Sequence, residues 1–280
     1  MASHETASTE KHSGEVLLEA RELRKFYRHG GGVFSRDGEG PRFTAVDGVS
    51  LEVQRGETFA VVGESGCGKT TLARMLLRLI EPDSGELRFG GKDLLSLRGA
   101  ALRAERRQMQ MVFQDPFASL DPRMRVGEIV GEPLEIHHSD LSKAEKQERT
   151  AAMLQRVGLG VDALQRYSHE FSGGQRQRIG IARALILRPK LVVADEPVSA
   201  LDVSVSAQVL LLLQELQSEF GLTFIFISHS LPVVAQVATR IAVMRAGKFV
   251  EVGSPEQVLH QPKDGYTREL LAAVPALPTR

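Results

Sequence analysis

The sequence predicts an α/β fold with a mainly parallel central sheet, because short apolar runs alternate with longer segments of helical periodicity. The apolar runs are nearly continuous, as strands are when helices cover both faces of their sheet. They lie at residues 58–62, 109–113, 191–194, 223–228 and 241–244. Between two of these runs, apolar residues at helical spacing precede Gly221, a residue typical of helix ends. They are Val205, Val209, Leu212, Leu216 and Phe220.

The middle third of the chain lacks strand-like runs and carries helical patterns at 144–157 and 175–187. We therefore expect an all-helical insertion, residues 115–188, within a core formed by residues 15–114 and 189–262. Together they make one domain, residues 15–274. The polar residues 1–14 predict a disordered tail, residues 275–280 a second tail, and the glycine-rich stretch 28–41 a flexible insertion between two early strands.

Composition excludes several classes of protein. The 280 residues include 35 Lys and Arg and 35 Asp and Glu, so the formal net charge is zero. Because the charges balance, the chain has no overall excess of positive charge, and we expect no nucleic-acid partner. A single cysteine excludes an intrachain disulfide framework. The most apolar run, residues 209–213, is far shorter than the roughly 20 residues that span a bilayer, so we expect a soluble chain without a targeting segment.

The strongest motif directly follows the first buried run. It fits the pattern G-x-x-x-x-G-K-[ST] with Gly63, Glu64, Ser65, Gly66, Cys67, Gly68, Lys69 and Thr70, and Thr71 continues into a helical segment. Glycines let backbone N–H groups turn inward around a phosphate, and the helix N-terminus adds partial positive charge. Lys69 supplies a point charge for the β- and γ-phosphates and Thr70 a hydroxyl for Mg²⁺. The alternative, an accidental glycine-rich turn, is disfavoured by the flanking strand and helix.

A nucleotide triphosphate site also needs an acidic position, and the run at 191–194 ends in Asp195 and Glu196. Asp195 at the strand terminus is predicted to hold the water shell of Mg²⁺. Glu196 is predicted to take a proton from the attacking water. The alternative is a strand that simply ends in two solvated acids.

A third motif, Ser172, Gly173, Gly174 and Gln175, opens the helical segment that continues from Arg176. A hydroxyl and two unobstructed amides suit an anion. In order with the other two motifs, it resembles the signature sequence of the ATP-binding-cassette (ABC) family, and the resemblance extends from about residue 17 to 273. It implies a P-loop NTPase core of the RecA-like kind, an N-terminal antiparallel β part, and the inserted helical subdomain. ATP and Mg²⁺ are the implied ligands.

Further residues resemble the family in order. Gln114 is similar to the Q-loop glutamine that contacts Mg²⁺ and water, and His229 to the switch histidine that touches the γ-phosphate. Asp202 resembles the D-loop residue that meets a partner subunit. With Lys69 and Glu196, Gln114 and His229 complete the catalytic set that the resemblance implies.

Two positions near these motifs need separate comment. Tyr27 matches the aromatic residue that stacks on adenine, with Phe26 as the alternative, and either residue could instead belong to the core. Ser230 stands where relatives usually carry Asp after the histidine, which leaves the hydrogen bonding of that loop open.

Residues 110–123, 194–202 and 266–275 resemble the ATPase subunits of oligopeptide, dipeptide and nickel importers. The resemblance implies a peripheral protein on the cytoplasmic face of an inner membrane. Its implied partners are a second ATPase subunit (a copy or a paralogue, paired head to tail), two transmembrane permease subunits and, indirectly, an external substrate-binding protein. Residues 116–135 are the predicted coupling surface for the permease, with a proline-rich connector as the alternative.

Two other functions compete with the transport hypothesis. A soluble cassette ATPase of DNA repair would insert a long coiled coil between Lys69 and Ser172, whereas their spacing fits a compact lobe, and translation types usually carry two cassettes. A nucleotide-binding regulator without catalysis would have lost Lys69 or Glu196, and both are present. The basic cluster at 103–107 is interpreted as a helix surface with balancing acids nearby.

Overall fold

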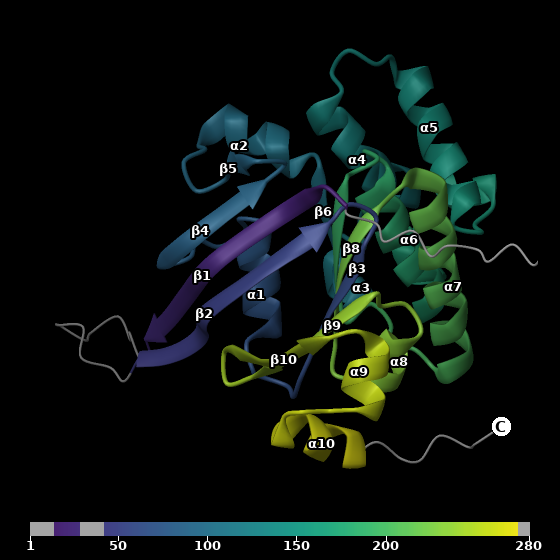
Figure 1. Ribbon diagram of the computed structural model, residues 1–280. Helices are drawn as coiled ribbons and strands as arrows, with labels where there is room; N and C mark the ends of the chain where they lie inside the picture. Colours follow the sequence, from purple (N-terminus) through teal and green to yellow (C-terminus); the bar gives the residue numbers. More distant parts are fainter. Residues whose placement is uncertain (1–13, 29–41, 274–280) are drawn as a thin grey trace, which may run out of the picture.

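Two sheets form the framework of the protein, whose computed structural model describes residues 14–28 and 42–273 (Figure 1). The tails expected at 1–14 and 275–280 and the insertion expected at 28–41 lie almost entirely outside these ranges. The larger sheet has six strands in the order β10-β9-β3-β8-β7-β6, and the smaller has four in the order β2-β1-β4-β5.

The larger sheet is parallel except at its β9–β10 edge, as the sequence predicts. Its strands are β3 (Thr58–Val62), β6 (Met109–Val112), β7 (Leu191–Asp195), β8 (Thr223–Ser228), β9 (Arg240–Arg245) and β10 (Lys248–Gly253). The predicted runs at 58–62 and 223–228 coincide with β3 and β8, and the other three agree within one residue at each end. The α/β prediction is confirmed.

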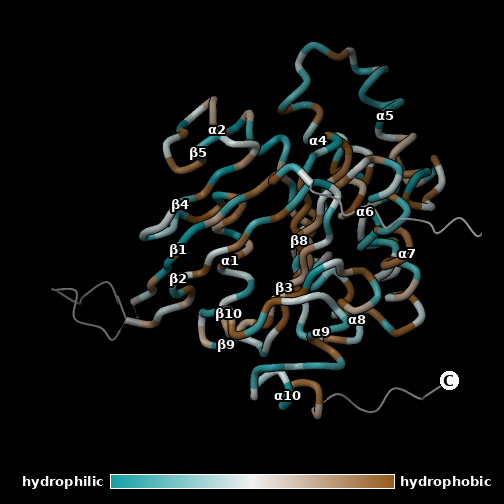
Figure 2. The backbone as a smooth tube through the Cα atoms, viewed as in Figure 1, coloured by the Kyte–Doolittle hydropathy of each residue, from teal (hydrophilic) through white to brown (hydrophobic). Residues whose placement is uncertain are grey.

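These strands have continuous apolar sequences because both faces of the sheet are buried. In β3, Phe59 and Val61 pack into a core shared with the smaller sheet. The alternate residues Ala60 and Val62 pack into a second core, shared with the helices of the opposite face. Figure 2 shows the hydrophobic segments concentrated in these central strands, whereas α5 (Lys143–Arg156) at the outer edge is mostly hydrophilic.

The smaller sheet is the N-terminal antiparallel part. Its long strands β1 (Val16–Arg28) and β2 (Arg42–Gln54) pair with each other, and β4 (Ser84–Phe89) and β5 (Lys92–Asp93) extend the sheet beyond β1. In the β1–β2 pairing Tyr27 lies opposite Phe43. The helices α1 (Lys69–Leu76) and α2 (Gly99–Arg106) complete this half.

Between β6 and β7 the chain forms helices, which lie together on one side of the larger sheet (Figure 1). They are α3 (Pro116–Ser119), α4 (Val126–His137), α5, the 3-10 turns η1 (Val161–Gln165) and η2 (Ser168–Glu170), and α6 (Gly173–Leu185). Pro133 lies inside α4. The helix tolerates it because α4 buries Ile129, Val130 and Leu134 against its neighbours, which outweighs the lost backbone hydrogen bond.

Helix α6 begins two residues before the helical pattern at 175–187. Ser172 is its N-cap, because its hydroxyl accepts a hydrogen bond from the Gln175 N–H at 3.4 Å, while the Gln175 side chain accepts one from the Ser172 N–H at 3.0 Å. This reciprocal pair is a capping box, which places Gly173 and Gly174 in the first helical turn.

The remaining helices follow β7. They are α7 (Val203–Phe220), α8 (Leu231–Ala235), α9 (Pro255–His260) and α10 (Gly265–Ala272). Gly221 ends α7 in the left-handed conformation with φ 63°, as predicted. None of the helices within residues 14–28 and 42–273 combines the length and apolarity needed to cross a bilayer.

Two leucines of α7 allow a matched test of this packing. Leu213 is 4% exposed and packs under the sheet, whereas Leu211, two residues away, is 59% exposed. We expect Leu213→Ala to lower the free energy of unfolding by about 2–5 kcal/mol, because it leaves a cavity in the core. Leu211→Ala should change it by less than about 0.5 kcal/mol. Urea unfolding of both variants measures the difference, and equal losses would contradict the placement of α7.

Candidate active site

The phosphate loop is positioned by two close backbone approaches. It runs from the end of β3 to the start of α1, and a Cβ atom at Gly63 would lie 2.2 Å from the Met244 carbonyl oxygen. At Gly68, φ is 112° and a Cβ atom would lie 2.1 Å from the Ala45 carbonyl oxygen. Only glycine fits at these two positions, so the loop is clamped between β9 and β2.

Lys69 is folded back over this loop. Its ammonium group donates hydrogen bonds to the carbonyl oxygens of Gly63 at 2.7 Å and Glu64 at 2.8 Å, and the residue is only 4% exposed. The stem is therefore held along the loop with the charge at its mouth. Burial raises the pKa of the neighbouring Cys67 thiol, although Lys69 acts in the opposite direction, so this cysteine is predominantly a neutral thiol near pH 7.

A tyrosine of the C-terminal helix supports the loop from outside. The Glu64 N–H donates a hydrogen bond to the Tyr266 hydroxyl at 3.2 Å. Tyr266 is 4% exposed, and the Arg245 guanidinium lies 4.6 Å from the centre of its ring. Burial raises the pKa of Tyr266, which keeps its hydroxyl neutral. A role for Tyr266 at this site was not predicted, because no local motif connects residues 202 positions apart.

At the end of β7, Asp195 faces the start of α1. The Thr70 hydroxyl donates a hydrogen bond to its carboxylate at 3.3 Å. Asp195 is 3% exposed, and this burial raises the pKa of its carboxyl group, an effect that the Thr70 hydrogen bond opposes and the charge of Glu196 reinforces. A hydroxyl and a carboxylate oxygen at this separation, beside a phosphate loop, are the oxygen donors that Mg²⁺ prefers, so the residues fit this ion.

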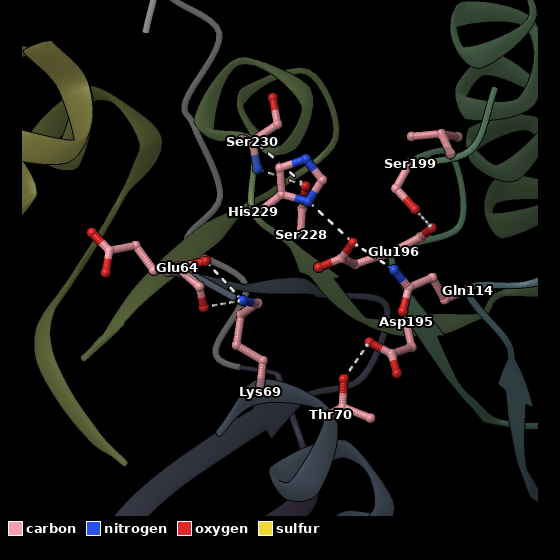
Figure 3. A network of polar contacts seen from close by, with 12 residues as sticks. Glu64, Lys69, Thr70, Gln114, Asp195, Glu196, Ser199, Ser228, His229 and Ser230 are labelled. Atoms are coloured by element: carbon pink, nitrogen blue, oxygen red, sulfur yellow. Dashed lines mark hydrogen bonds and ion pairs between the residues drawn. The ribbon is translucent and has the colours of Figure 1, made fainter. Parts of the chain in front are cut away.

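Glu196 is the centre of the polar network in Figure 3. One of its carboxylate oxygens, Oε2, accepts a hydrogen bond from Gln114 Nε2 at 3.1 Å and lies 3.1 Å from His229 Nδ1. A carboxylate only accepts hydrogen bonds, so Nδ1 carries the proton in this contact. The three side chains come from the ends of β6, β7 and β8, as expected for residues that follow parallel strands.

The backbone of Glu196 adopts a conformation that is costly for a residue with a side chain. Its φ is +46°, in the left-handed region. Hydrogen bonds hold it there: the Glu196 N–H donates to the Ile227 carbonyl at 2.9 Å, and the Ser199 N–H and hydroxyl donate to the Glu196 carbonyl at 3.2 and 3.1 Å. This turn directs the Glu196 carboxylate away from that of Asp195 and toward Gln114 and His229 (Figure 3).

A hollow of about 600 Å³ joins the loop to this network. It is lined by predicted residues from distant parts of the chain, including Tyr27, Gly66, Lys69, Thr70, Gln114, Glu196 and His229. Phe43 and Ala45 also line it and were missed by the sequence analysis. Phe43 lies there because it is paired with Tyr27, and this pairing could not be read across the stretch between the two strands. The volume is in the range of small-molecule sites.

The signature residues and Asp202 are not part of this hollow. Ser172 and Gly173 lie at the start of α6, and a Cβ atom at Gly173 would lie 3.6 Å from Leu201. Asp202 is the N-cap of α7, where it accepts hydrogen bonds from the Val205 N–H and the Ser204 hydroxyl, each at 2.9 Å. The Val205 bond lowers the pKa of the Asp202 carboxyl group. The two predicted partner-facing segments therefore adjoin each other but not the phosphate loop.

The loop after His229 explains how Ser230 is accommodated. The Ser230 N–H donates to the Ser228 hydroxyl at 3.0 Å, and α8 begins at the next residue. The Ser230 side chain makes no capping hydrogen bond at this helix end. The orientation of His229 therefore depends on its contact with Glu196 and on the backbone of this turn.

Comparisons with known proteins identify the family of the chain. The family described as ABC transporter matches residues 46–199. The oligopeptide transport ATP-binding protein OppF of Escherichia coli K12 is 54% identical over 231 residues, covering 82% of this chain and 69% of its own. The dipeptide transport ATP-binding protein DppF of the same organism is 49% identical over 263 residues, covering 94% and 78%.

Solved structures are similar across most of the chain. A dimeric, post-hydrolysis ATP-binding cassette, MJ0796 bound to ADP and Pi, has a TM-score of 0.75 at 27% identity and covers 85% of this chain and 99% of its own. CbiO1 of Clostridium perfringens, part of the ABC transporter complex cbiONQ, has a TM-score of 0.74 at 26% identity and covers 92% and 96%. The fold and site thus define an ATP-binding cassette. The chain belongs to the ABC transporter family.

The Tyr266 contact makes a prediction about nucleotide binding. Tyr266→Phe keeps the buried ring and removes the hydroxyl that holds the Glu64 amide, a hydrogen bond of about 0.5–1.5 kcal/mol. We expect ATP affinity to fall by about 2- to 12-fold, measured by equilibrium binding of a fluorescent ATP analogue. Tyr167→Phe, a change of the same kind on the helical insertion, is the control and should leave affinity unchanged. If wild type, Tyr266→Phe and Tyr167→Phe bind ATP with equal affinity, the Tyr266 hydroxyl does not support the loop.

Proposed function

We propose that this chain is the ATP-hydrolysing subunit of an importer of oligopeptides or dipeptides. Two observations support the proposal. The Glu196 carboxylate contacts both Gln114 and His229 beside the phosphate loop, which is an arrangement suited to activating water. The relatives named above are oligopeptide and dipeptide transport ATP-binding proteins. These relatives disfavour a soluble ATPase of DNA repair or translation.

ATP would bind with its adenine against Tyr27 and its phosphates on the loop formed by Gly63 to Thr71. Lys69 already points its ammonium at the mouth of the loop, so a phosphate oxygen would replace the carbonyl groups that it now contacts. Thr70, Asp195 and Gln114 would hold Mg²⁺, which when bound supplies positive charge to the β- and γ-phosphates. The N-terminus of α1 adds the partial charge of its free amides.

Glu196 would act as the base for hydrolysis. Water attacks the γ-phosphorus, the bond from this atom to the bridging oxygen of ADP breaks, and the water proton passes to the Glu196 carboxylate. Gln114 and His229 keep the carboxylate in place, since both contact its Oε2 atom. His229 and Lys69 stabilise charge on the transferred phosphoryl group. The products are ADP and inorganic phosphate.

The signature residues would complete the site from a second subunit. Ser172, Gly173, Gly174 and Gln175 do not line the hollow around the phosphate loop of their own chain. In a head-to-tail dimer, the first-turn amides of α6 would face the γ-phosphate bound to the partner, with Asp202 beside the contact. The dimeric cassette bound to ADP and Pi supports dimerisation. Loss of the γ-phosphate then weakens the dimer.

Transport would require permease subunits, and a second hollow suits their docking. It measures about 670 Å³ and is lined by residues of β6, α3, α4 and α6, among them Phe113, Ser119, Pro133 and Arg183. It includes part of the predicted coupling surface 116–135 and reaches Gln114 and Asp195. A permease segment there would touch the catalytic glutamine. This role implies a peripheral protein at the cytoplasmic face of the inner membrane, served by an external substrate-binding protein.

The catalytic part of the proposal is tested by Glu196→Gln. The amide keeps the shape of the side chain but accepts no proton, so we expect ATP binding to persist and hydrolysis to fall by at least about 100-fold. A dimer should accumulate with ATP, visible by size-exclusion chromatography with light scattering. Glu215→Gln, an exposed change on α7, is the control. Wild-type turnover in Glu196→Gln would exclude Glu196 as the base.

The transport part is tested by co-purification from membranes. The chain is affinity-tagged and expressed in its native cell, where its partner subunits are also made. After detergent extraction it should retain two integral membrane subunits. Charge reversal at Arg183, which lines the proposed docking hollow, should lower this recovery without changing ATP binding. Recovery of nucleic acid or ribosomal proteins, with no membrane subunit, would favour the soluble alternatives.

A further inference from the structure

A second basic site lies outside the nucleotide-binding region. It is a hollow of about 510 Å³ whose lining residues include Arg107, Arg149, Arg156 and Arg188 together with His138. We call these five residues and the hollow the basic pocket. Its remaining lining includes Met153, Ile186 and Phe220, and its lining contains no carboxylate. The lining therefore combines basic and apolar residues.

The arginines converge from separate segments of the chain. Arg149 and Arg156 lie on one face of α5, two turns apart, Arg107 follows α2, and Arg188 follows α6. Arg188 has φ +50°, and its guanidinium lies 5.6 Å from the centre of the Phe220 ring. A left-handed residue and a cation–π contact therefore direct this charge toward the pocket.

The cationic charge of the pocket is only partly balanced. Arg156 pairs with Glu219, and His138 lies 3.6 Å from Asp140. Arg107, Arg149 and Arg188 form no ion pair with any residue of the described ranges, although Arg149 is close enough to lower the pKa of Glu145. Glu105, the acid within the 103–107 cluster, is buried and bonded to Lys92 and Gln108.

The field of these arginines reaches nearby groups. The pKa of His137 is lowered, first by its burial and then by Arg107, Arg103 and His138. A positive potential disfavours a further positive charge and favours an anion. Guanidinium groups present planar pairs of donors that match phosphate oxygens, so several of them around one hollow favour a phosphate group.

The pocket also adjoins the proposed docking face. Arg106 lines the hollow proposed for the permease, and the next residue, Arg107, lines the basic pocket. If the permease docks there, which rests on the proposed function, the pocket lies at the edge of the face that the permease covers. The arginines suit an anionic group, and the apolar lining residues Met153, Ile186 and Phe220 suit a hydrocarbon part of the same ligand.

We propose that the basic pocket binds the phosphate group of an acidic phospholipid. The formal net charge of the chain is zero, so overall attraction to an acidic membrane is weak and local charge decides binding. The pocket would add a direct lipid contact to the attachment through the permease. It would also orient the helical insertion relative to the bilayer.

The test uses the purified chain without any permease, so it does not depend on the proposed transport function. Vesicles of phosphatidylcholine, with or without phosphatidylglycerol, are sedimented with the protein at about 0.1 M salt. We expect binding only when phosphatidylglycerol is present. Substitution of Arg107, Arg149 and Arg188 by Gln should weaken it about fivefold for each arginine, or about 100-fold together.

A matched variant controls for the loss of charge. Gln in place of Arg21, Arg88 and Arg268, three exposed arginines outside the pocket, removes the same charge and should leave vesicle binding near the wild-type value. Arg149→Gln alone, a single exposed change on α5, should still weaken binding about fivefold if the triple variant folds poorly. Circular dichroism and ATP binding report folding.

Three results would overturn the proposal. One is equal binding of the pocket variants and wild type, and another is an equal loss in the control variant, which would indicate non-specific attraction. The third is tight binding of glycerol phosphate in solution without any binding to vesicles, which would assign the pocket to a soluble phosphate. Failure to recover permease subunits with intact vesicle binding would instead count against the transport function alone.

Discussion

The close backbone contacts of the phosphate loop are the constraint on which the rest of the site depends. Gly63 lies against the Met244 carbonyl of β9 and Gly68 against the Ala45 carbonyl of β2. The loop is therefore fixed to both sheets at once, and its opening toward Thr70 and Asp195 is set by the framework. A preorganised cradle costs little reorganisation when an anion binds, which is how a short glycine-rich segment becomes a specific site.

Glu196 shows how the same framework accommodates local strain. The residue departs from the ideal backbone of a strand end with φ +46°, and three hydrogen bonds from or to neighbouring strands and turns keep it there. The cost of such a conformation is of order 1–3 kcal/mol. The left-handed conformation of Glu196 makes the two adjacent carboxylates point in different directions. Asp195 faces Thr70, and Glu196 faces Gln114 and His229. One strand terminus thereby serves two chemical purposes.

Much of this arrangement could be predicted because it depends on short, contiguous segments of the sequence. Strands β3 and β8 were identified to the residue, since burial on both faces requires continuous apolar sequence. The roles predicted for Lys69, Asp195 and Glu196 rest on contiguous motifs. The contacts of Phe43 and Tyr266 were not predictable, because each depends on which distant elements pack together. Helix α4 was obscured by Pro133, whose cost is offset by tertiary burial that no local pattern reports.

The hollow around the phosphate loop and the hollow proposed for docking share residues, and under the proposed function this would link nucleotide chemistry to docking. Thr70 and Gln114 line both of them, and Gln114 also holds Glu196. A segment that entered the outer hollow would touch Gln114, and a shift of this residue would break its 3.1 Å contact with Oε2 of Glu196. Conversely, a γ-phosphate bound between Lys69 and His229, in the hollow around the phosphate loop, would influence the position of the Gln114 side chain. Under the proposed function, the two sites would be coupled if nucleotide and permease each favoured a different arrangement of the Gln114 side chain.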